Sequence, residues 1–386
     1  MLRLHTFACM RNVMLCLILS LLFSCSEGKR SHDAYAQDTS TIPLRYAEGF
    51  TITKIGDATQ VTVRYPYQGA TSGHTYLLVK DEDNVPDVPA GTAVIKIPIK
   101  SIVCTSTTHI PMLDYLGETN KLTGFPTLDY VSSPAMRARI DSGKVQELGV
   151  DKSINLEILA ALRPDLVMGY SLTGDYGQFR KMEELGIPVV LNAEYLEKHP
   201  LGRAEWIKFV ALFFDKLEKA DSIFSSIEKA YNETRMLAAQ VKERPTVLSG
   251  IVYGDAWFLP GGKNYAARLF EDAGCQYLWA DDSSNGFMQL SFESVYAKAH
   301  AADLWIGVAS FTSLEEMQKA DKRYAGFNAF KRGEVYTYNA RLGLKGGNEY
   351  LELGYLRPDI ILKDLVKIAH PRILPDYRLY FHKKLE

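Results

Sequence analysis

Side chains that suit ligand binding follow the predicted strands of this sequence, at the points where the strands end. The strongest candidates are, in chain order, Thr107, His109, Tyr170, Tyr253, Trp257 and Arg341. Open α/β sheets bind ligands at the carboxyl ends of their strands. Aromatic faces, hydroxyl groups and one guanidinium suit a bulky ligand that carries polar or anionic groups. Each aromatic residue taken singly is as well explained by core packing, so the interpretation depends on the whole set.

Signatures of catalysis are scarce. The sequence has no Gly-x-Ser-x-Gly nucleophile elbow, no phosphate-binding P-loop and no His-Glu-x-x-His zinc motif. Its eight histidines are scattered, and His109 is the one that follows a sheet strand at the predicted cleft. His109 is therefore either a polar loop residue or a base or metal ligand. No cysteine pair has metal-ligand spacing, and we expect Cys104 and Cys275 to be buried thiols.

The composition excludes one class of partner. The chain has 386 residues, 47% of them hydrophobic and 23% charged, with a formal net charge of -2. A folded protein with room for two domains is expected from these values. No basic block is interleaved with aromatic residues, which argues against nucleic-acid binding. The 22 tyrosines suit a site for a large, partly polar ligand.

Strands and helices alternate on both sides of residues 201–245, which predicts two similar α/β lobes with small, mainly parallel sheets. The N-terminal lobe is expected at 99–200 and the C-terminal lobe at 246–386. Residues 45–98 instead show the alternating pattern of a small antiparallel β appendage. The fold class is therefore α/β with an added N-terminal sheet.

A single long helix is predicted from Ala204 to Arg244. Gly202 precedes it, Pro245 follows it, and its apolar residues recur every three or four positions. This backbone helix region, 201–245, is either an ordinary surface helix or a rigid connection between the lobes. The similarity of the two lobes favours the connection.

The first 25 residues indicate a lipoprotein signal peptide. A short apolar run, 13–23, follows Arg3 and Arg11, and it is too short to span a bilayer. It ends in Leu22-Phe23-Ser24-Cys25, so Cys25 is the expected lipid anchor; a simple cleaved signal with an incidental cysteine is the alternative. Residues 26–44 are then a flexible tether.

Two glutamates open equivalent helices in the two lobes. Glu157 follows Asn155-Leu156, and Glu293 follows Ser291-Phe292. An acidic residue in the first turn of a helix is favoured by the helix dipole, which explains both positions without a functional role. The alternative is a matched pair of surface acids that docks on a basic partner.

The pattern resembles the class III, helical-backbone periplasmic substrate-binding proteins of ABC importers for ferric siderophores, haem or cobalamin, in the lipoprotein form of Bacteroides-like bacteria. The resemblance is carried by Lys100 to Thr107, by Asn155 to Val167 with its Arg163-Pro164-Asp165 segment, by the backbone helix, and by Gly347 to Tyr350, Arg357-Pro358-Asp359 and His370-Pro371. It covers the chain from about Ile99 to the C-terminus.

This resemblance implies a ligand held between two lobes and delivered to an ABC permease and ATPase complex. It also implies that one glutamate per lobe docks on the permease: Glu157 in the first lobe, and Glu293 or its rival Glu271 in the second. The family usually has a separate short helix before its backbone helix, so a break near Asp215 is expected. Relatives that bind bare metal use several cleft histidines and acids, and only His109 is in place here.

We therefore expect a monomeric, periplasmic, lipid-anchored binding protein without cofactor or enzymatic activity, whose cargo is a ferric siderophore or haem. Cobalamin or another corrinoid is the first alternative. A secreted enzyme that uses His109 as its base, or a surface interaction lipoprotein, are the others.

Overall fold

The structure, a computed structural model, describes residues 39–83, 85–89 and 92–386. The N-terminal sheet has the strand order β1-β2-β3-β4-β5, with β2–β4 antiparallel and β5 parallel to β4. Its strands are β1 (Thr39–Ile42), β2 (Phe50–Ile55), β3 (Ala58–Val63), β4 (His74–Val79) and β5 (Ala93–Lys96). Gly56 makes the β2–β3 turn with a φ of 57°, a conformation that glycine adopts without strain. The predicted antiparallel appendage is confirmed, with one parallel strand added.

The N-lobe, as we call the unit built on the next sheet, has the strand order β12-β11-β6-β7-β8, all parallel. Its strands are β6 (Ile102–Cys104), β7 (Leu122–Phe125), β8 (Gln146–Glu147), β11 (Leu166–Gly169) and β12 (Val189–Leu191), with a small hairpin of β9 (Gly149–Val150) and β10 (Ser153–Ile154). Its helices are α2 (His109–Leu116), α3 (Pro134–Asp141), α4 (Leu156–Leu162) and α5 (Gly177–Glu184). Strands β6, β11 and β12 are buried on both faces, as expected for a parallel sheet covered by helices, whereas the edge strand β8 is exposed.

The C-lobe repeats this plan with the order β16-β13-β18-β19-β20, parallel except for β20. Its strands are β13 (Thr246–Ser249), β16 (Gln276–Tyr277), β18 (Leu304–Ile306), β19 (Val335–Thr337) and β20 (Lys383–Lys384). A second, antiparallel sheet contains β14 (Ile251–Tyr253), β15 (Ala256–Pro260) and β17 (Phe287–Leu290). The helices are α9 (Tyr265–Asp272), α10 (Phe292–Ala299), α11 (Leu314–Ala320), α12 (Asn328–Lys331), α13 (Glu349–Leu353) and α14 (Pro358–Ala369). Two similar α/β lobes are thus confirmed.

The predicted single helix from Ala204 to Arg244 is wrong. The segment forms α6 (Pro200–Glu205), α7 (Ile207–Leu212) and α8 (Leu217–Ala238), and Asp215 breaks the chain direction with a φ of 55°. Residues 206–214 are apolar except for Lys208 and buried on all sides, whereas α8 has one buried face, so only α8 follows the amphipathic period. The break near Asp215 agrees with the expectation from the family resemblance.

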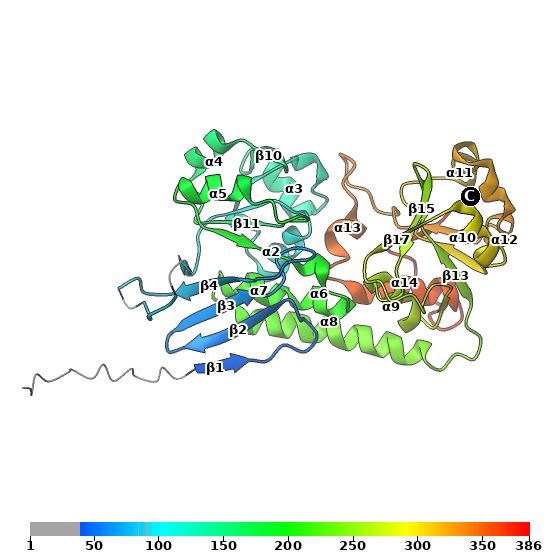
Figure 1. Cartoon of the computed structure of the whole chain (residues 1–386), viewed down its shortest axis with the longest axis horizontal. Coiled ribbons are helices and arrows are strands. Elements are labelled where there is room, and N and C mark those ends of the chain that lie inside the picture. The colour runs from blue at the N-terminus through cyan, green and yellow to red at the C-terminus, as the bar shows by residue number, and fades with distance from the viewer. Residues whose placement is uncertain (1–38, 84, 90–91) are drawn as a thin grey trace, which may run out of the picture. The chain divides into compact units, whose positions relative to one another are not determined.

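Helix α8, in green in Figure 1, connects the lobes through its packing partners. It contacts α6 and α7 on the N-lobe side and α14 of the C-lobe. Cys104 and Cys275 are both buried and free, as predicted. In the described part of the chain, no helix is both long enough and apolar enough to cross a membrane.

Candidate functional site

A cavity of about 470 Å³ lies between the segment 195–203 and the C-lobe. One wall of the cavity is formed by the loop before α6 and by Arg203. The facing wall belongs to the C-lobe and is formed by β14, β15, α9, α13 and the end of β19. Five tyrosines line it: Tyr195, Tyr265, Tyr338, Tyr350 and Tyr355. Its volume lies within the range of about 300–1,000 Å³ that is usual for small-molecule sites.

Arg203 is the one buried cation of this cavity among the described residues. Its guanidinium carbon lies 3.5 Å from the ring centroid of Tyr265 and 4.4 Å from that of Tyr355. Its Nε donates to the carbonyl of Glu197 at 3.2 Å, and Nη2 donates to the carbonyl of Tyr195 at 2.8 Å. Nη1 is buried and has no partner among the described residues. The side chain thus packs against two tyrosine rings, and one of its donors has no partner in the described part of the chain.

Local sequence explains how these residues are held. Pro200 occupies the first turn of α6, and His199 Nδ1 accepts from the backbone N–H of Leu201 at 3.1 Å. Asn264 caps α9 by accepting from the N–H of Ala266 at 2.9 Å, which places Tyr265 at the first residue of that helix. Helices α6 and α9 are thus positioned so that Arg203 of α6 contacts the ring of Tyr265 of α9.

Three tyrosines of the cavity, Tyr338, Tyr350 and Tyr355, are neutral hydrogen-bonding groups at physiological pH. Burial raises the pKa of Tyr338 and Tyr355, and it raises the pKa of Tyr350 well above its usual value. The rings of Tyr338 and Tyr350 stack with centroids 4.8 Å apart. These side chains offer flat apolar faces together with O–H donors, an arrangement suited to an aromatic ligand with oxygen atoms.

His382 also lines the cavity, and its ring is held in place by Asp364. The Nδ1 of His382 lies 3.0 Å from Asp364 Oδ2. Burial acts to raise the pKa of Asp364, but the hydrogen bonds from His382 and from backbone N–H groups outweigh it and lower that pKa. Among the described residues, no group of three His, Cys, Asp or Glu side chains is arranged to hold a metal ion.

The proposed ligand contact of Trp257 is corrected by the structure. Trp257 is 0% exposed and its indole N–H donates to the carbonyl of Ser249 at 3.0 Å. Its ring stacks on Trp305, with centroids 5.3 Å apart, inside the C-lobe core. The segment 256–260 is strand β15 instead of a loop, so neighbouring side chains face opposite sides, and Phe258 is the residue that lines the cavity.

His109 also lies apart from the cavity. It is the first residue of α2, is 0% exposed, and neither ring nitrogen has a partner among the described residues. Burial lowers its pKa to about 3, so the ring is neutral. A buried ring of this kind cannot meet a ligand in the cleft, and the suggested base or metal ligand at this position is not supported by its geometry.

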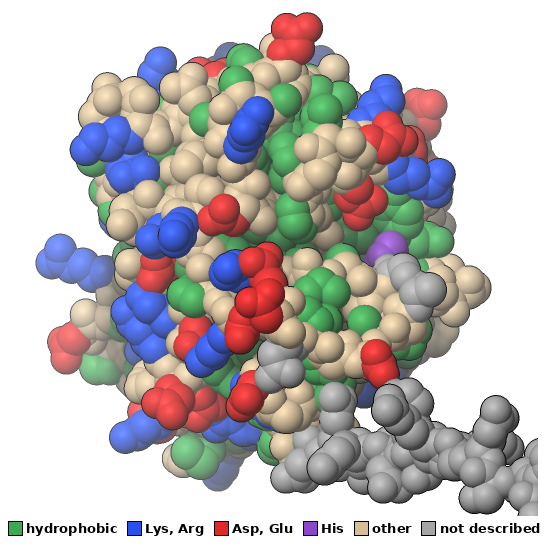
Figure 2. Space-filling view, turned by 90° about the vertical axis from the view of Figure 1, so that its left-hand side faces the viewer, with side chains coloured by type: hydrophobic (Ala, Val, Ile, Leu, Met, Phe, Trp, Pro, Cys, Tyr) green, Lys and Arg blue, Asp and Glu red, His purple; other side chains and the backbone are tan. Residues whose placement is uncertain are grey.

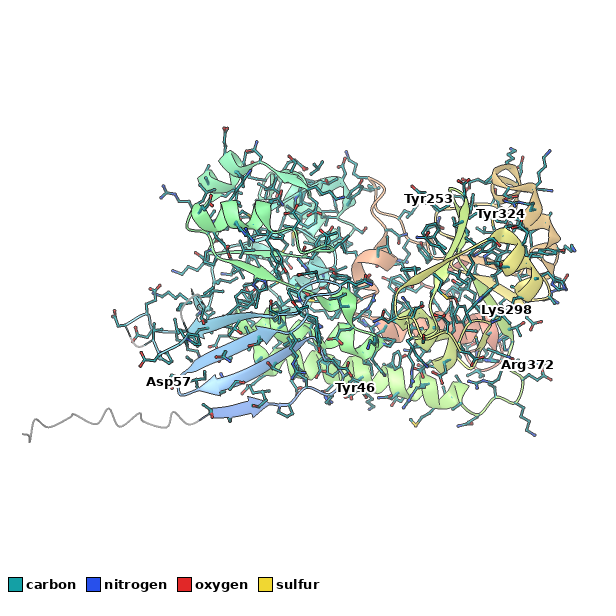
Figure 3. The ribbon with its side chains drawn as sticks, in the orientation of Figure 1. Tyr46, Asp57, Tyr253, Lys298, Tyr324 and Arg372 are labelled. Carbon is teal, nitrogen blue, oxygen red and sulfur yellow. The ribbon has the colours of Figure 1, made fainter. Side chains whose placement is uncertain are left out.

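The other four predicted contacts also lie outside the lining of the cavity. Thr107 is half-buried before α2, and Tyr170 donates to Asp151 at 2.8 Å. Tyr253 is 77% exposed at the end of β14, where Figure 3 labels it. Arg341 is exposed and its Nε lies 2.8 Å from Glu349 Oε2. Their roles in binding stay predictions.

The candidate docking glutamates are exposed and occupy equivalent positions. Glu157 and Glu293 are each the second residue of their helix, after the side-chain caps Asn155 and Ser291. Glu293 Oε1 lies 3.6 Å from Arg323 Nη1. The rival Glu271 is the last residue but one of α9, with its Oε2 3.4 Å from Arg268 Nη1. Among the described side chains on the face in Figure 2, acidic and basic groups are interspersed.

Arg203 was absent from the residues predicted from sequence. It immediately precedes the helix predicted from Ala204 to Arg244, and no local motif marks it. Tyr338 and Phe258 do follow predicted strands, so their position was a usable signal. Cys25 lies outside the described residues.

Comparison with known proteins identifies the family. Residues 102–342 match the protein family described as "Periplasmic binding protein". An uncharacterised lipoprotein of Methanocaldococcus jannaschii is 26% identical over 332 residues, which cover 81% of this chain and 76% of that protein. A second lipoprotein of the same organism is 26% identical over 355 residues, 88% of this chain and 86% of its own length.

Solved structures with this fold include two proteins of stated ligand. The periplasmic haem-binding protein RhuT of Roseiflexus sp. RS-1 superposes with a TM-score of 0.53 at 19% identity, over 71% of this chain and 99% of that one. Helicobacter pylori CeuE with bound Ni(II) gives 0.56 at 17% identity, over 76% and 92%. At this identity the likeness concerns the fold. The family match, together with two lobes joined by α8, means that the chain belongs to the periplasmic binding protein family, in its helical-backbone form.

Proposed function

We propose that this protein captures an anionic iron complex, a ferric siderophore or haem, in the cavity between segment 195–203 and the C-lobe, and delivers it to an ABC import permease. The observation that carries the proposal is Arg203, a buried cation packed against two tyrosine rings, with its Nη1 unpartnered among the described residues. A buried charge is costly unless it is paired. A carboxylate, catecholate or similar oxygen of the ligand would supply that pair.

The chemistry of the cavity favours an aromatic anion. Ferric catecholates and haem both carry flat conjugated rings with anionic oxygens, which match the tyrosine faces and Arg203 respectively. The carboxylate of Glu197, also in the lining, already accepts from the N–H groups of Glu48 and Gly49 and from the Trp206 indole. Among the described lining residues, the buried Arg203 and the exposed Lys198 are then the cations that favour an anionic ligand. A corrinoid, whose charge is less negative, is the competing ligand.

The remaining parts of the proposal follow from the family and the sequence. The chain acts as a binding protein without catalysis, anchored on the periplasmic side of a membrane through a lipid on Cys25. The exposed glutamates Glu157 and Glu293 supply the permease contact, one on each lobe. The protein works as a monomer because one chain holds both walls of the cavity.

Ligand titration tests the proposal directly. We would titrate the purified protein with haem, a ferric tris-catecholate and cyanocobalamin, and follow tryptophan fluorescence, with zinc and manganese ions as controls. Saturable binding of haem or the ferric complex at micromolar affinity or better is expected. Saturation by cyanocobalamin alone would transfer the role to corrinoid uptake, and saturation by a bare metal ion would contradict the proposed cargo.

Variants of Arg203 decide whether the cavity is the site. Arg203→Ala should weaken binding at least tenfold, since a hydrogen bond to a charged partner contributes about 1.5–3 kcal/mol. Arg203→Lys should recover only part of the affinity, because lysine lacks the planar fork. Arg372→Ala is the matched control: Arg372, labelled in Figure 3, is exposed and lies outside the lining of the cavity. Wild-type affinity in Arg203→Ala would remove this cavity from the proposal.

A further inference from the structure

The loop between β3 and β4, residues 64–73, reaches the ligand cavity. We call it the strap. Gln68 of the strap lines the cavity together with Asn285 and Gly286 of the C-lobe. A Cβ atom added at Gly286 would lie 4.0 Å from Gln68 Nε2. A segment of the N-terminal sheet therefore lies against the C-lobe beside the proposed ligand.

The other side of the strap packs on the N-lobe. The ring of Tyr67 meets the ring of Tyr176 edge to face, with centroids 5.8 Å apart. A Cβ atom at Gly174 would come within 2.6 Å of the Tyr67 ring, so the strap passes directly over this glycine. A second hollow of about 280 Å³ shares Gln68, Glu197 and Asn285 with the main cavity and is lined by Tyr67 as well. The strap thus contacts both lobes at the rim of the site.

The N-terminal sheet is fixed firmly enough to form a wall. The buried carboxylate of Glu205 accepts from the backbone N–H groups of Arg45, Tyr46 and Ala47 at 2.8–3.0 Å. Figure 3 labels Tyr46 in this segment, just before β2. Glu197, which lines the cavity, accepts in the same way from Gly49 at 2.8 Å. Glu197 and Glu205 lie on either side of Arg203 in the chain. The segment that carries Arg203 therefore also holds the chain that leads into the N-terminal sheet.

Gly49 shows how closely the two parts fit. A Cβ atom at Gly49 would lie 2.9 Å from the Trp206 ring and 3.0 Å from Glu197 Oε1. The indole of Trp206 donates to that same oxygen at 2.9 Å. Backbone, carboxylate and indole are packed without space for a side chain, which is the packing of a core and not of a loosely attached module.

We propose that the N-terminal sheet is a third wall of the ligand site and that Gln68 contacts the ligand through its side-chain amide. This inference rests on the proposed function of the cavity. An amide offers both a donor and an acceptor, so Gln68 selects ligands with a carbonyl, hydroxyl or carboxylate oxygen at their outer edge. The strap lies before residue 102, where the family match begins, and it adds a specificity-determining contact to the two-lobed site.

Affinity measurements on the full chain test the contact. Haem and the ferric tris-catecholate are the probes, and Gln68→Ala, Gln68→Glu and the control Gln318→Ala are compared with the wild type. Gln318 is exposed on α11, away from the cavity lining. We expect Gln68→Ala to weaken binding about fivefold, and Gln68→Glu to weaken it further because a negative charge faces an anionic ligand. Wild-type affinity in both variants would overturn the contact.

Hydrogen exchange tests the wall without any ligand. In the double variant Tyr67→Ala/Gln68→Ala, amides near residues 174–176 and 284–287 should exchange faster, because the strap no longer covers either lobe. Unchanged exchange in both regions would overturn the third wall. If the wild type binds neither probe, the proposed ligand class fails, while faster exchange in the double variant would still support the strap as part of the cavity.

Discussion

Glu352 in α13 accepts a hydrogen bond from the backbone N–H of Ser132, with 2.6 Å between nitrogen and oxygen. The N–H of Ser133 donates to the second carboxylate oxygen at 2.8 Å. The two serines precede α3 of the N-lobe, and α13 packs against α2 of the same lobe. One buried carboxylate therefore joins segments 220 residues apart in the sequence, next to the cavity that Tyr350 and Leu351 of α13 also line.

This carboxylate predicts a pH dependence of stability. Burial raises the pKa of Glu352 from its ordinary value of 4.5 to about 7. The two N–H donors act in the opposite direction, but their effect is smaller. At a pH between these two pKa values, Glu352 is protonated in the folded protein and ionised in the unfolded chain. The free energy of unfolding must then fall as the pH rises through this window, by at most about 3 kcal/mol. Urea titrations near pH 5 and near pH 8 measure this change.

The variant Glu352→Gln isolates the contribution of this group. It does not titrate, so its free energy of unfolding should change less between the two pH values than that of the wild type. Glu315→Gln, at an exposed position on α11, is the matched control and should keep the wild-type slope. Equal slopes in Glu352→Gln and the wild type would show that Glu352 does not carry this pH dependence.

Neighbouring residues of β15 should separate stability from binding. Trp257→Ala removes a fully buried ring stacked on Trp305, and should lower the free energy of unfolding by about 3–5 kcal/mol. Phe258→Ala removes a half-buried ring from the cavity wall, and should weaken haem binding severalfold at a smaller cost in stability. Urea titration and fluorescence titration of both variants measure the two effects. A stable Trp257→Ala variant that fails to bind haem would reverse these roles.

The same strand shows what sequence reasoning can and cannot predict. The short apolar runs at 102–104, 166–169 and 304–306 indicate buried strands because almost every residue in them is apolar. The facing of side chains within β15 depends on its pairing with β14 and β17, which no local pattern specifies. A shift of one residue exchanges Trp257 for Phe258 at the cavity.

Arg203 was beyond sequence reasoning for a different reason. Its function depends on Tyr265 and Tyr355, which lie 62 and 152 positions further along the chain (265 − 203 and 355 − 203) and approach it only in the folded protein. The long-helix error has a local cause: residues 206–214 are apolar nearly throughout, so an amphipathic period can be fitted to them from either side. The resemblance to the family anticipated the break that this periodicity concealed.

The lipid anchor gives a prediction outside the described residues. If Cys25 carries the lipid, Cys25→Ser should abolish labelling with a radioactive fatty acid. It should also release the protein from the membrane fraction, because the apolar run 13–23 that remains is too short to span a bilayer. Cys16→Ser, in the same apolar run, is the matched control and should label normally. Labelling that survives Cys25→Ser would contradict the anchor.

The docking glutamates predict a separation of uptake from binding. Glu157 and Glu293 are exposed, occupy the same position in equivalent helices, and lie outside the lining of the cavity. Charge reversal at both, Glu157→Lys with Glu293→Lys, should abolish uptake of the iron complex, since like charges at a docked interface cost several kcal/mol. Affinity for the ligand should stay unchanged, because neither side chain reaches the cavity. Glu315→Lys, an equally exposed acid on α11, should leave both uptake and affinity intact. A second double variant, Glu157→Lys with Glu271→Lys, identifies the docking residue of the C-lobe. Loss of uptake only in this second variant would assign the contact to Glu271 on α9. Wild-type uptake in both double variants would exclude docking through these carboxylates.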